Sequence, residues 1–450
     1  MKSKTKTSIN QKLQSGQYIN FPFAPNRWPF FYGWVIVAMA TLGTIASIPG
    51  QTIGVGVFTD SLIKVLKRSR TELTIAYMLG TIASSMLLPW VGSLIDRLGV
   101  RVMAVISSLG LGISLFIFSY ADLIPKISSA ALPAIAMLAL LFMLIRFFGQ
   151  GCLTMVSRIA LARWFNHRRG MATGIANVIV AYAFNCSPAL LNAMVNSKGW
   201  KSSYILLAGA VGIGMTVISA IFFRDNPKQC SLVMDGCNDP DWIAKKIAQL
   251  PQATKQFTRK QAIGTSAFWI YTLTNAWQAL VMTAVTFHMT SIGAEFNLTS
   301  EQSYAFFPYI GLVSVAAAVI TGFLSDYIRL KWLIQASIIC QILTPIGLME
   351  LSHQGTQILF ITSYGISAGL FGLLLTIVAP RFFGHKHLGA ISGLTASTLV
   401  FTSALGPILF STLRDFTGTY RHVMILSVII PGLLFIGSLG LKNPQSTIKE

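Results

Sequence analysis

Long apolar runs dominate this sequence, and Lys, Arg, Asp and Glu are nearly absent from them. Only 11% of the 450 residues are charged and 53% are apolar, whereas about 25% of residues are charged in soluble domains. Runs of about 20 such residues are long enough to cross a bilayer as helices, in which the backbone satisfies its own hydrogen bonds. They exclude a soluble globular fold and predict an all-α membrane protein.

Twelve apolar runs separated by short polar segments predict twelve transmembrane helices. Their expected ranges are 30–57, 73–95, 102–121, 131–160, 171–195, 202–223, 263–289, 303–325, 332–351, 357–380, 388–411 and 422–441.

The longest connection follows the sixth predicted helix and divides the chain into six helices plus six. We therefore expect a cytoplasmic tail at 1–29, an N-terminal six-helix bundle at 30–223, a cytoplasmic central loop at 224–262, a C-terminal six-helix bundle at 263–441 and a cytoplasmic tail at 442–450.

The two halves repeat one another. The segment GSLIDRLGVR (92–101) follows the second helix of its half, and GFLSDYIRLK (322–331) follows the second helix of the other. Two glycines and a proline recur at a constant offset of 219 residues: Gly170, Gly174 and Pro188 match Gly389, Gly393 and Pro407. The repeat predicts two pseudo-symmetric six-helix bundles. Such internal repeats are typical of secondary transporters, which bind substrate near the middle of the membrane between the repeats.

The net charge of +20 does not indicate a nucleic-acid-binding protein, because the sequence contains no soluble basic domain. The charge instead follows from the distribution of Lys and Arg between the two sides of the membrane. The tails and the even-numbered loops contain 23 Lys and Arg residues, against nine in the opposite loops. Positive residues concentrate on the cytoplasmic side of membrane proteins. We therefore predict a multi-pass protein of an inner or plasma membrane with both termini cytoplasmic.

The loop motifs resemble those of the major facilitator superfamily over about residues 30–441. The first motif has the form Gly-x-x-x-Asp-Arg-x-Gly-x-Arg, and a second copy and the segment RFFGQG (146–151) lie where the family has them. The motif residues are Gly92, Asp96, Arg97, Gly99 and Arg101 in the first copy and Gly322, Asp326, Arg329 and Lys331 in the second. The resemblance implies the twelve-helix major facilitator fold.

Other segments resemble the oxalate–formate antiporter and monocarboxylate porter branch of that family. They are FFYGW (30–34), RWFNHRRGMATG (163–174), GWKSSY (199–204), FFRDNP (222–227) with Asp235-Gly236, and RFFGHKHLGAISG (381–393). This resemblance implies an organic anion such as a monocarboxylate as substrate. Relatives that carry carboxylates tend to have a basic residue in helix one, eight or eleven, and this chain has none there.

The acidic residue of each loop motif is expected to act as a conformational latch. At a helix end, a carboxylate can cap the N-terminus of a neighbouring helix or pair with an arginine, and such a contact can exist in one state and break in the other. A topology signal combined with loop solubility is the alternative. The predicted latch residues are Gly92, Asp96, Arg97, Arg101, Gly322, Asp326 and Arg329.

Arg146 lies near the middle of the fourth predicted helix, where a charge has to face a cavity or a partner. It binds an anionic group of the substrate in one interpretation, and the backbone carbonyls of a neighbouring helix in the other.

Further candidate substrate-binding residues are polar side chains within the predicted helices. No carboxylate lies in the interior of any predicted helix, so His288 is the titratable candidate for proton coupling, with a polar anchor as its alternative. Each of the others alone is also explained by hydrogen bonding between helices. These candidates are Gln51, Asn185, Asn275, Gln278, His288, Tyr309 and Tyr364.

Together these features predict a secondary active or facilitative transporter of a small organic solute that works by alternating access. A carrier of a neutral or zwitterionic metabolite such as an amino acid, and a non-transporting membrane receptor of the same fold, are the alternatives. We expect no enzymatic activity, catalytic residue, cofactor or metal. The expected partners are the substrate, a coupled proton or counter-anion and the lipid bilayer; we expect no nucleic acid, and a monomer.

Overall fold

The computed structural model describes residues 22–68, 70–127, 130–236, 255–299, 302–303 and 305–445. Within these ranges the chain is helical and has no β-strand. The predicted tail up to residue 21, residues 237–254 of the predicted central loop, and residues 446–450 lie outside the described part. The prediction of an all-α fold is confirmed.

The N-terminal half contains the first six predicted transmembrane helices, three of which are interrupted. Short 3-10 and π-helical segments join the pieces of the first, fourth and sixth. The elements are α2 (Gly33–Ala46), η2 (Ile48–Gly50), α3 (Thr52–Leu66), α4 (Arg70–Leu98), α5 (Val100–Phe118), α6 (Ile124–Ile127), α7 (Ala131–Ile145), the π-helix η4 (Arg146–Leu153), α8 (Thr154–Trp164), α9 (Arg169–Gly209), the π-helix η5 (Ala210–Met215) and α10 (Thr216–Phe222).

Gly199 separates the fifth transmembrane passage from the sixth within α9. Its φ of 78° is left-handed, a conformation that glycine adopts without a steric penalty.

The C-terminal half consists of uninterrupted helices. They are α12 (Arg259–Ile263), α13 (Ser266–Ala294), α15 (Phe306–Leu324), α16 (Leu330–Leu348), α17 (Gln354–Phe383), α18 (Leu388–Thr417) and α19 (Arg421–Leu439).

Nine helical segments of the described part are long and apolar enough to cross a membrane, and α2 is a shorter apolar helix. Several helices are longer than their predicted apolar runs, because hydropathy marks the part inside the hydrocarbon and not the helix end. The α3 helix, for example, continues to Leu66 instead of ending at residue 57, so Asp60 lies within a helix.

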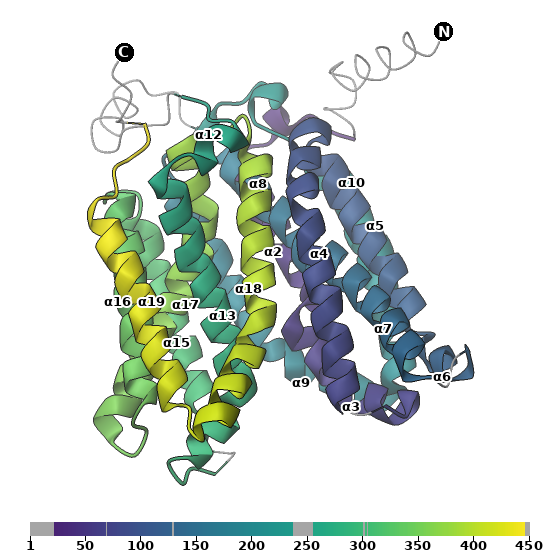
Figure 1. Cartoon of the computed structure of the whole chain (residues 1–450). Coiled ribbons are helices and arrows are strands. Elements are labelled where there is room, and N and C mark those ends of the chain that lie inside the picture. The colour runs from purple at the N-terminus through teal and green to yellow at the C-terminus, as the bar shows by residue number, and fades with distance from the viewer. Residues whose placement is uncertain are drawn as a thin grey trace.

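The two halves stand side by side, with α4 against α18 and α9 against α15 (Figure 1). Glycines allow both contacts to be close. A Cβ atom added to Gly393 of α18 would lie 3.1 Å from the Cα of Gly92 in α4, and one added to Gly322 of α15 would lie 2.9 Å from the Cα of Gly174 in α9. Small residues of this kind let helix backbones approach each other in a membrane.

Asp96, near the end of α4, and Asp326, just after α15, lie at the same end of the molecule, because both carboxylates contact helix starts of the opposite half. We call this end, formed by residues 96–101, 163–171, 324–330 and 381–390, the latch end. The described residues of the connections at 119–127, 295–299, 349–353 and 418–420 lie at the opposite end (Figure 1).

Candidate functional site

A cavity of about 560 Å³ lies between the two halves. The elements α2, α3, η4, α8 and α9 line it from the N-terminal half, and α13, α15, α17 and α18 line it from the C-terminal half. The interrupted helices of the N-terminal half contribute directly, since η4 is a π-helix whose Gln150 and Gly151 face the cavity. Single π-helical segments inside α-helices are frequent at functional sites. A cavity walled by both bundles is suited to a solute that passes between them.

Arg158 of α8 is the one charged side chain among the residues that line this cavity. It is half-buried. In the part of the chain that the structure describes, no hydrogen bond or ion pair holds its guanidinium group, although Tyr271 of α13 lies within electrostatic range. The cavity wall therefore contains a cation and no carboxylate. An anionic ligand in the cavity would neutralise that cation.

Spare hydrogen-bonding capacity lies on the same N-terminal wall as Arg158. Four buried polar atoms there have no hydrogen-bond partner among the described residues: Gln150 Oε1, Ser157 Oγ, Thr173 Oγ1 and Asn177 Nδ2. Buried polar atoms are usually paired, so an unpaired group in a cavity wall is suited to a ligand or to water.

The C-terminal wall is mainly apolar, with side chains such as Met282, Phe307, Phe371, Leu375 and Leu399. Several hydroxyl groups on this wall donate to carbonyls of their own half and are already satisfied. Thr286 donates to the Met282 carbonyl over 2.7 Å, and Thr376 donates to the Gly372 carbonyl over 3.2 Å. The two walls therefore differ in chemistry, polar and cationic on one side and apolar on the other.

Arg146 does not line the cavity. Its side chain is 2% exposed, and its Nη1 donates to the carbonyl of Gly50 over 3.3 Å and to Thr52 Oγ1 over 3.2 Å. Its guanidinium lies 5.0 Å from the centre of the Tyr77 ring, a cation–π contact. These contacts match the interpretation in which Arg146 holds the broken first helix through a backbone carbonyl. Its predicted role in substrate binding stays a prediction.

Two of the other predicted binding residues line the cavity. Gln51 does so while its Nε2 donates to Ser47 Oγ and Thr154 Oγ1, and Tyr364 does so while its hydroxyl donates to the Met282 carbonyl over 3.4 Å.

The remaining predicted binding residues lie elsewhere. Asn275 and Gln278 are buried and hydrogen-bonded within the C-terminal half, to the Tyr271 carbonyl and to Ser367 respectively. Tyr309 is 62% exposed. His288 connects the Pro407 carbonyl to the Tyr420 hydroxyl, each over 2.9 Å, and does not line the cavity. The side chain of Asn185 lies outside the described part.

The predicted latch residues Asp96 and Asp326 form two equivalent sets of contacts at the latch end. Asp96 accepts hydrogen bonds from the backbone N–H groups of Gly389 (2.9 Å) and Ala390 (2.8 Å) at the start of α18, and from Arg163 Nη2 (2.9 Å). A carboxylate at a helix N-terminus is stabilised by the free N–H groups and by the helix dipole. Asp96 thus joins the N-terminal half to the C-terminal half.

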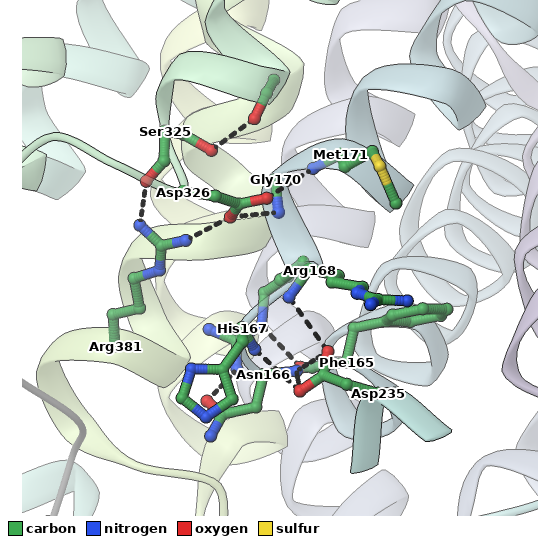
Figure 2. Close-up of polar contacts among 12 residues, drawn as sticks. Phe165, Asn166, His167, Arg168, Gly170, Met171, Asp235, Ser325, Asp326 and Arg381 are labelled. Carbon is green, nitrogen blue, oxygen red and sulfur yellow. Dashed lines mark hydrogen bonds and ion pairs between the residues drawn. The ribbon is translucent and has the colours of Figure 1, made fainter. Parts of the chain in front are cut away.

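Asp326 makes the equivalent contacts from the C-terminal half to the N-terminal half (Figure 2). Its oxygens accept from the N–H groups of Gly170 and Met171 at the start of α9, both over 3.0 Å, and from Arg381 Nη2 over 2.8 Å. Burial raises the pKa of the Asp326 carboxyl, and the Arg381 charge together with the two N–H groups opposes that rise. Arg381 also donates to the carbonyl of Ser325.

A third carboxylate, which was not predicted as a site, binds the same helix start. Asp235 accepts from the backbone N–H groups of Asn166, His167 and Arg168 over 2.8–3.2 Å (Figure 2). It belongs to the central loop that follows the N-terminal bundle, and it fixes the α8–α9 turn that presents Gly170 to Asp326.

The other predicted latch residues are placed differently from the two acids. Gly92 and Gly322 lie at the close helix contacts described above. Arg101 donates from Nε to the Ala220 carbonyl over 2.8 Å and from its backbone N–H to Asp225. Arg97 and Arg329 are exposed.

Sequence reasoning missed Arg158, Arg163 and Arg381. The last two had a sequence signal, since RWF (163–165) and RFF (381–383) precede the same glycines of the repeat. Arg158 falls two residues before the predicted end of the fourth helix at residue 160, whereas α8 continues to Trp164.

A pair of basic side chains, the buried Arg169 and the half-buried His385, completes the latch end. Arg169 Nη2 lies 3.1 Å from Nε2 of His385, so that the two halves meet there also. Burial and the nearby positive charges lower the pKa of His385 to about 3. Burial, with Arg381 next, lowers the pKa of Arg169 to about 9. His385 is therefore neutral and accepts the hydrogen bond of Arg169. Among the described residues, no group of three His, Cys, Asp or Glu side chains could hold a metal ion.

The chain is an integral membrane protein of the class that consists of two pseudo-symmetric helical bundles with a cavity between them. A family model described as Major Facilitator Superfamily matches residues 31–407, and the chain belongs to that family. The family predicted from the loop motifs is thereby confirmed.

Curated relatives match at low identity. Monocarboxylate transporter 4 of Rattus norvegicus is 22% identical over 276 residues, which cover 60% of this chain and 56% of that protein. A probable sulfoacetate transporter of Cupriavidus necator, SauU, is 23% identical over 62% of this chain and 66% of its own length. The chain thus spans little more than half the length of the monocarboxylate transporters that it matches. The relatives are named as transporters, in agreement with the expectation that this chain is not an enzyme.

Solved structures share the fold. The human organic anion transporter MFSD10 superimposes with a TM-score of 0.64 at 13% identity, over 90% of this chain and 98% of that one. The proton:xylose symporter XylE superimposes with a TM-score of 0.66 at 14% identity, over 91% and 94%. At these identities the likeness establishes the twelve-helix fold.

Proposed function

We propose that this protein is a membrane transporter that moves a small organic anion by alternating access, and that Arg158 binds the anionic group. The observation that carries the proposal is the charge of the cavity wall, which includes Arg158 and no carboxylate. A cation without a partner in a partly desolvated cavity favours an anionic ligand and disfavours a cationic one.

The relatives reported above support the same substrate class, since one is named for monocarboxylates and the other for sulfoacetate. The charge in this chain comes from the fourth transmembrane helix, since the first, eighth and eleventh predicted helices contain no Lys or Arg. A neutral or zwitterionic substrate remains the alternative, and the unpaired amides Gln150 and Asn177 are the observation that favours it.

The latch supports alternating access. Asp96 and Asp326 each hold a helix start of the opposite half, so the described arrangement is closed at the latch end. We propose that the latch contacts break when the cavity opens toward that end. Because the basic loops lie at the latch end, we propose that this end faces the cytoplasm.

Binding of radiolabelled acids and their amides to purified protein, followed by uptake into proteoliposomes, tests the proposal. Arg158→Gln should weaken binding of acids by about tenfold or more, because a charge-assisted hydrogen bond contributes about 1.5–3 kcal/mol. Arg158→Lys should retain part of the affinity, since it keeps the charge and loses the planar fork.

The matched control is Arg421→Gln, which removes an exposed arginine at the opposite end. It should bind acids as the wild type does. Acid binding that is unchanged in Arg158→Gln, or equal binding of acids and amides by the wild type, would remove the basis of the anion assignment.

A further inference from the structure

Tyr271 faces Arg158 across the boundary between the two halves. Arg158 belongs to α8 of the N-terminal half and Tyr271 to α13 of the C-terminal half, and both line the cavity. The Tyr271 ring is buried, its hydroxyl lies beside Thr395 of α18, and the guanidinium of Arg158 is within electrostatic range. Each half therefore contributes a hydrogen-bond donor to the cavity lining, and the two groups lie within electrostatic range of each other.

We infer that Tyr271 is a second substrate-binding residue, and that its hydroxyl and the Arg158 guanidinium hold the same anionic group from opposite halves. This inference rests on the proposed function and assigns a role to a residue that the anion assignment alone does not need. A carboxylate offers two oxygens with about four lone-pair sites, enough for a guanidinium and a phenol hydroxyl together.

The neighbours of Tyr271 permit this role. Thr395 and Thr272 hold one another over 3.3 Å, and Thr395 also donates to the Ile391 carbonyl over 3.4 Å. Thr395 therefore has another partner when Tyr271 turns its hydroxyl toward a ligand. The Tyr271 carbonyl accepts from Asn275 Nδ2 over 2.8 Å, which fixes the backbone that carries the ring. The hydroxyl can change partner while the ring stays in place.

The difference in chemistry between the two cavity walls explains why the Tyr271 hydroxyl should contribute to the preference for acids over amides. The nearby lining of the C-terminal half is apolar at Leu375, Leu388, Leu399 and Val400. Tyr271 is thus a hydrogen-bond donor of that half within electrostatic range of the cation, while the spare polar atoms lie on the N-terminal wall. An anion bound by both residues bridges the halves, so its binding energy depends on how close they are.

The test measures the preference for acids over amides, which a purely structural tyrosine would not change. The probes are propionate, lactate, phenylacetate, succinate and sulfoacetate, with propionamide, lactamide and phenylacetamide as neutral counterparts of the first three. Tyr271→Phe keeps the ring and removes the donor. We expect acid binding to weaken about three- to tenfold with amide binding nearly unchanged, because a net hydrogen bond is worth about 0.5–1.5 kcal/mol and one to a charged group more.

A double variant of Arg158→Gln and Tyr271→Phe separates a shared ligand from two independent effects. Because both residues hold one group, the combined loss should be smaller than the product of the single losses, and this coupling is measured by the double-mutant cycle. Tyr309→Phe is the matched control, since Tyr309 is exposed and outside the cavity lining.

The outcomes distinguish this inference from the proposed function. If Arg158→Gln loses the acid preference and Tyr271→Phe retains it, or if the single losses multiply in full, the Tyr271 role is wrong and the anion assignment stands. If the wild type prefers none of the acids, the proposed function fails as well. Should Tyr271→Phe not fold, Tyr271→His retains a ring with a donor and should keep part of the acid preference; a complete loss would overturn the inference.

Discussion

The guanidinium of Arg146 is enclosed by Gly50, Thr52 and Tyr77, whereas that of Arg158 faces the cavity without a hydrogen-bond partner among the described residues. The first arrangement stabilises the break between α2 and α3, because a buried carbonyl without a partner costs about 1–3 kcal/mol. The second leaves a charge available to a ligand.

Substitution of these two arginines should therefore have different effects on stability and on binding. Arg146→Gln should destabilise the protein by about 1–3 kcal/mol and preserve the preference for acids over amides. Arg158→Gln should abolish that preference with little loss of thermal stability. Thermal unfolding and acid binding, measured on both variants, check this; a loss of acid preference in Arg146→Gln at unchanged stability would restore the substrate-binding interpretation of Arg146.

His385 makes the closed latch end sensitive to pH. It is neutral in the closed arrangement, where burial and the charges of Arg169, Arg163 and Lys228 lower its pKa to about 3. When the latch end opens and the ring becomes hydrated, its pKa returns toward the ordinary 6.5. The closed arrangement disfavours protonation of His385. The closed arrangement therefore has its full stability above pH 6.5 and loses stability as the pH falls from 6.5 toward 3.

Each pH unit below 6.5 should thus shift the equilibrium toward the open latch end by up to about tenfold. Distances between spin labels on the two halves, measured between pH 7.5 and 5, report this shift. His385→Gln should remove most of the pH dependence, while His387→Gln in the same loop should retain it. If wild type and His385→Gln respond to pH alike, His385 is not the sensor.

At the scale of helices, Gly92 lets α4 approach α18 most closely at the latch end. A Cβ atom at Gly92 would lie 2.9 Å from the Cα of Gly393 and closer still to the Gly389 carbonyl. These are backbone atoms, so neither helix can make room by rotating a side chain. The closed arrangement depends on this position remaining glycine.

Gly92→Ala should therefore favour the open latch end without disturbing either bundle. We expect the population of the short inter-half distance between labels on α4 and α18 to fall at least several-fold, with the helix content unchanged. Gly432→Ala is the control, because a Cβ atom there meets nothing within 4 Å. An unchanged distance distribution in Gly92→Ala would mean that α4 and α18 do not separate when the protein changes state.

The sequence predicted the elements better than the faces that they present. Apolar runs and the 219-residue repeat were sufficient for twelve helices in two bundles, and the repeated acidic motifs identified Asp96 and Asp326. Which face a side chain takes was not predictable. Twelve residues of regular α-helix place Arg146 and Arg158 about 120° apart, and the π-helix between them alters that angle. Hydropathy reports depth in the membrane and contains no information on this rotation.

At the scale of the whole molecule, the two halves are joined by matching contacts at one end. Asp96 holds α18, Asp326 holds α9, and Arg169 meets His385. The two acid contacts are related by the internal repeat, so a single relative motion of the bundles breaks both. We propose that the latch is coupled to the cavity through α8, which carries both Arg158 and Arg163, the partner of Asp96.

The orientation of this latch in the membrane can be tested directly. The excess of Lys and Arg, 23 against nine, predicts that the latch end and both termini are cytoplasmic. A reporter that is active only outside the cytoplasm should be inactive when fused after Glu450 and active when fused in the connection 119–130. Activity at Glu450 would reverse the assignment.

If the latch end is cytoplasmic, the described arrangement is closed to the cytoplasm, and the cavity is reached from outside. Thr286 lies in the cavity wall, eight residues before α13 ends at the opposite end of the molecule. In a variant without native cysteines, Thr286→Cys should then react with a membrane-impermeant thiol reagent added outside, and an acid that binds should slow the reaction.

Asp96→Asn weakens the latch, because it removes the charge that pairs with Arg163 and with the start of α18. It should reduce labelling from outside by shifting molecules toward the cytoplasm-facing state, with little change in the intrinsic affinity for the acid. Labelling that is equally fast in Asp96→Asn would show that the latch does not control access to the cavity.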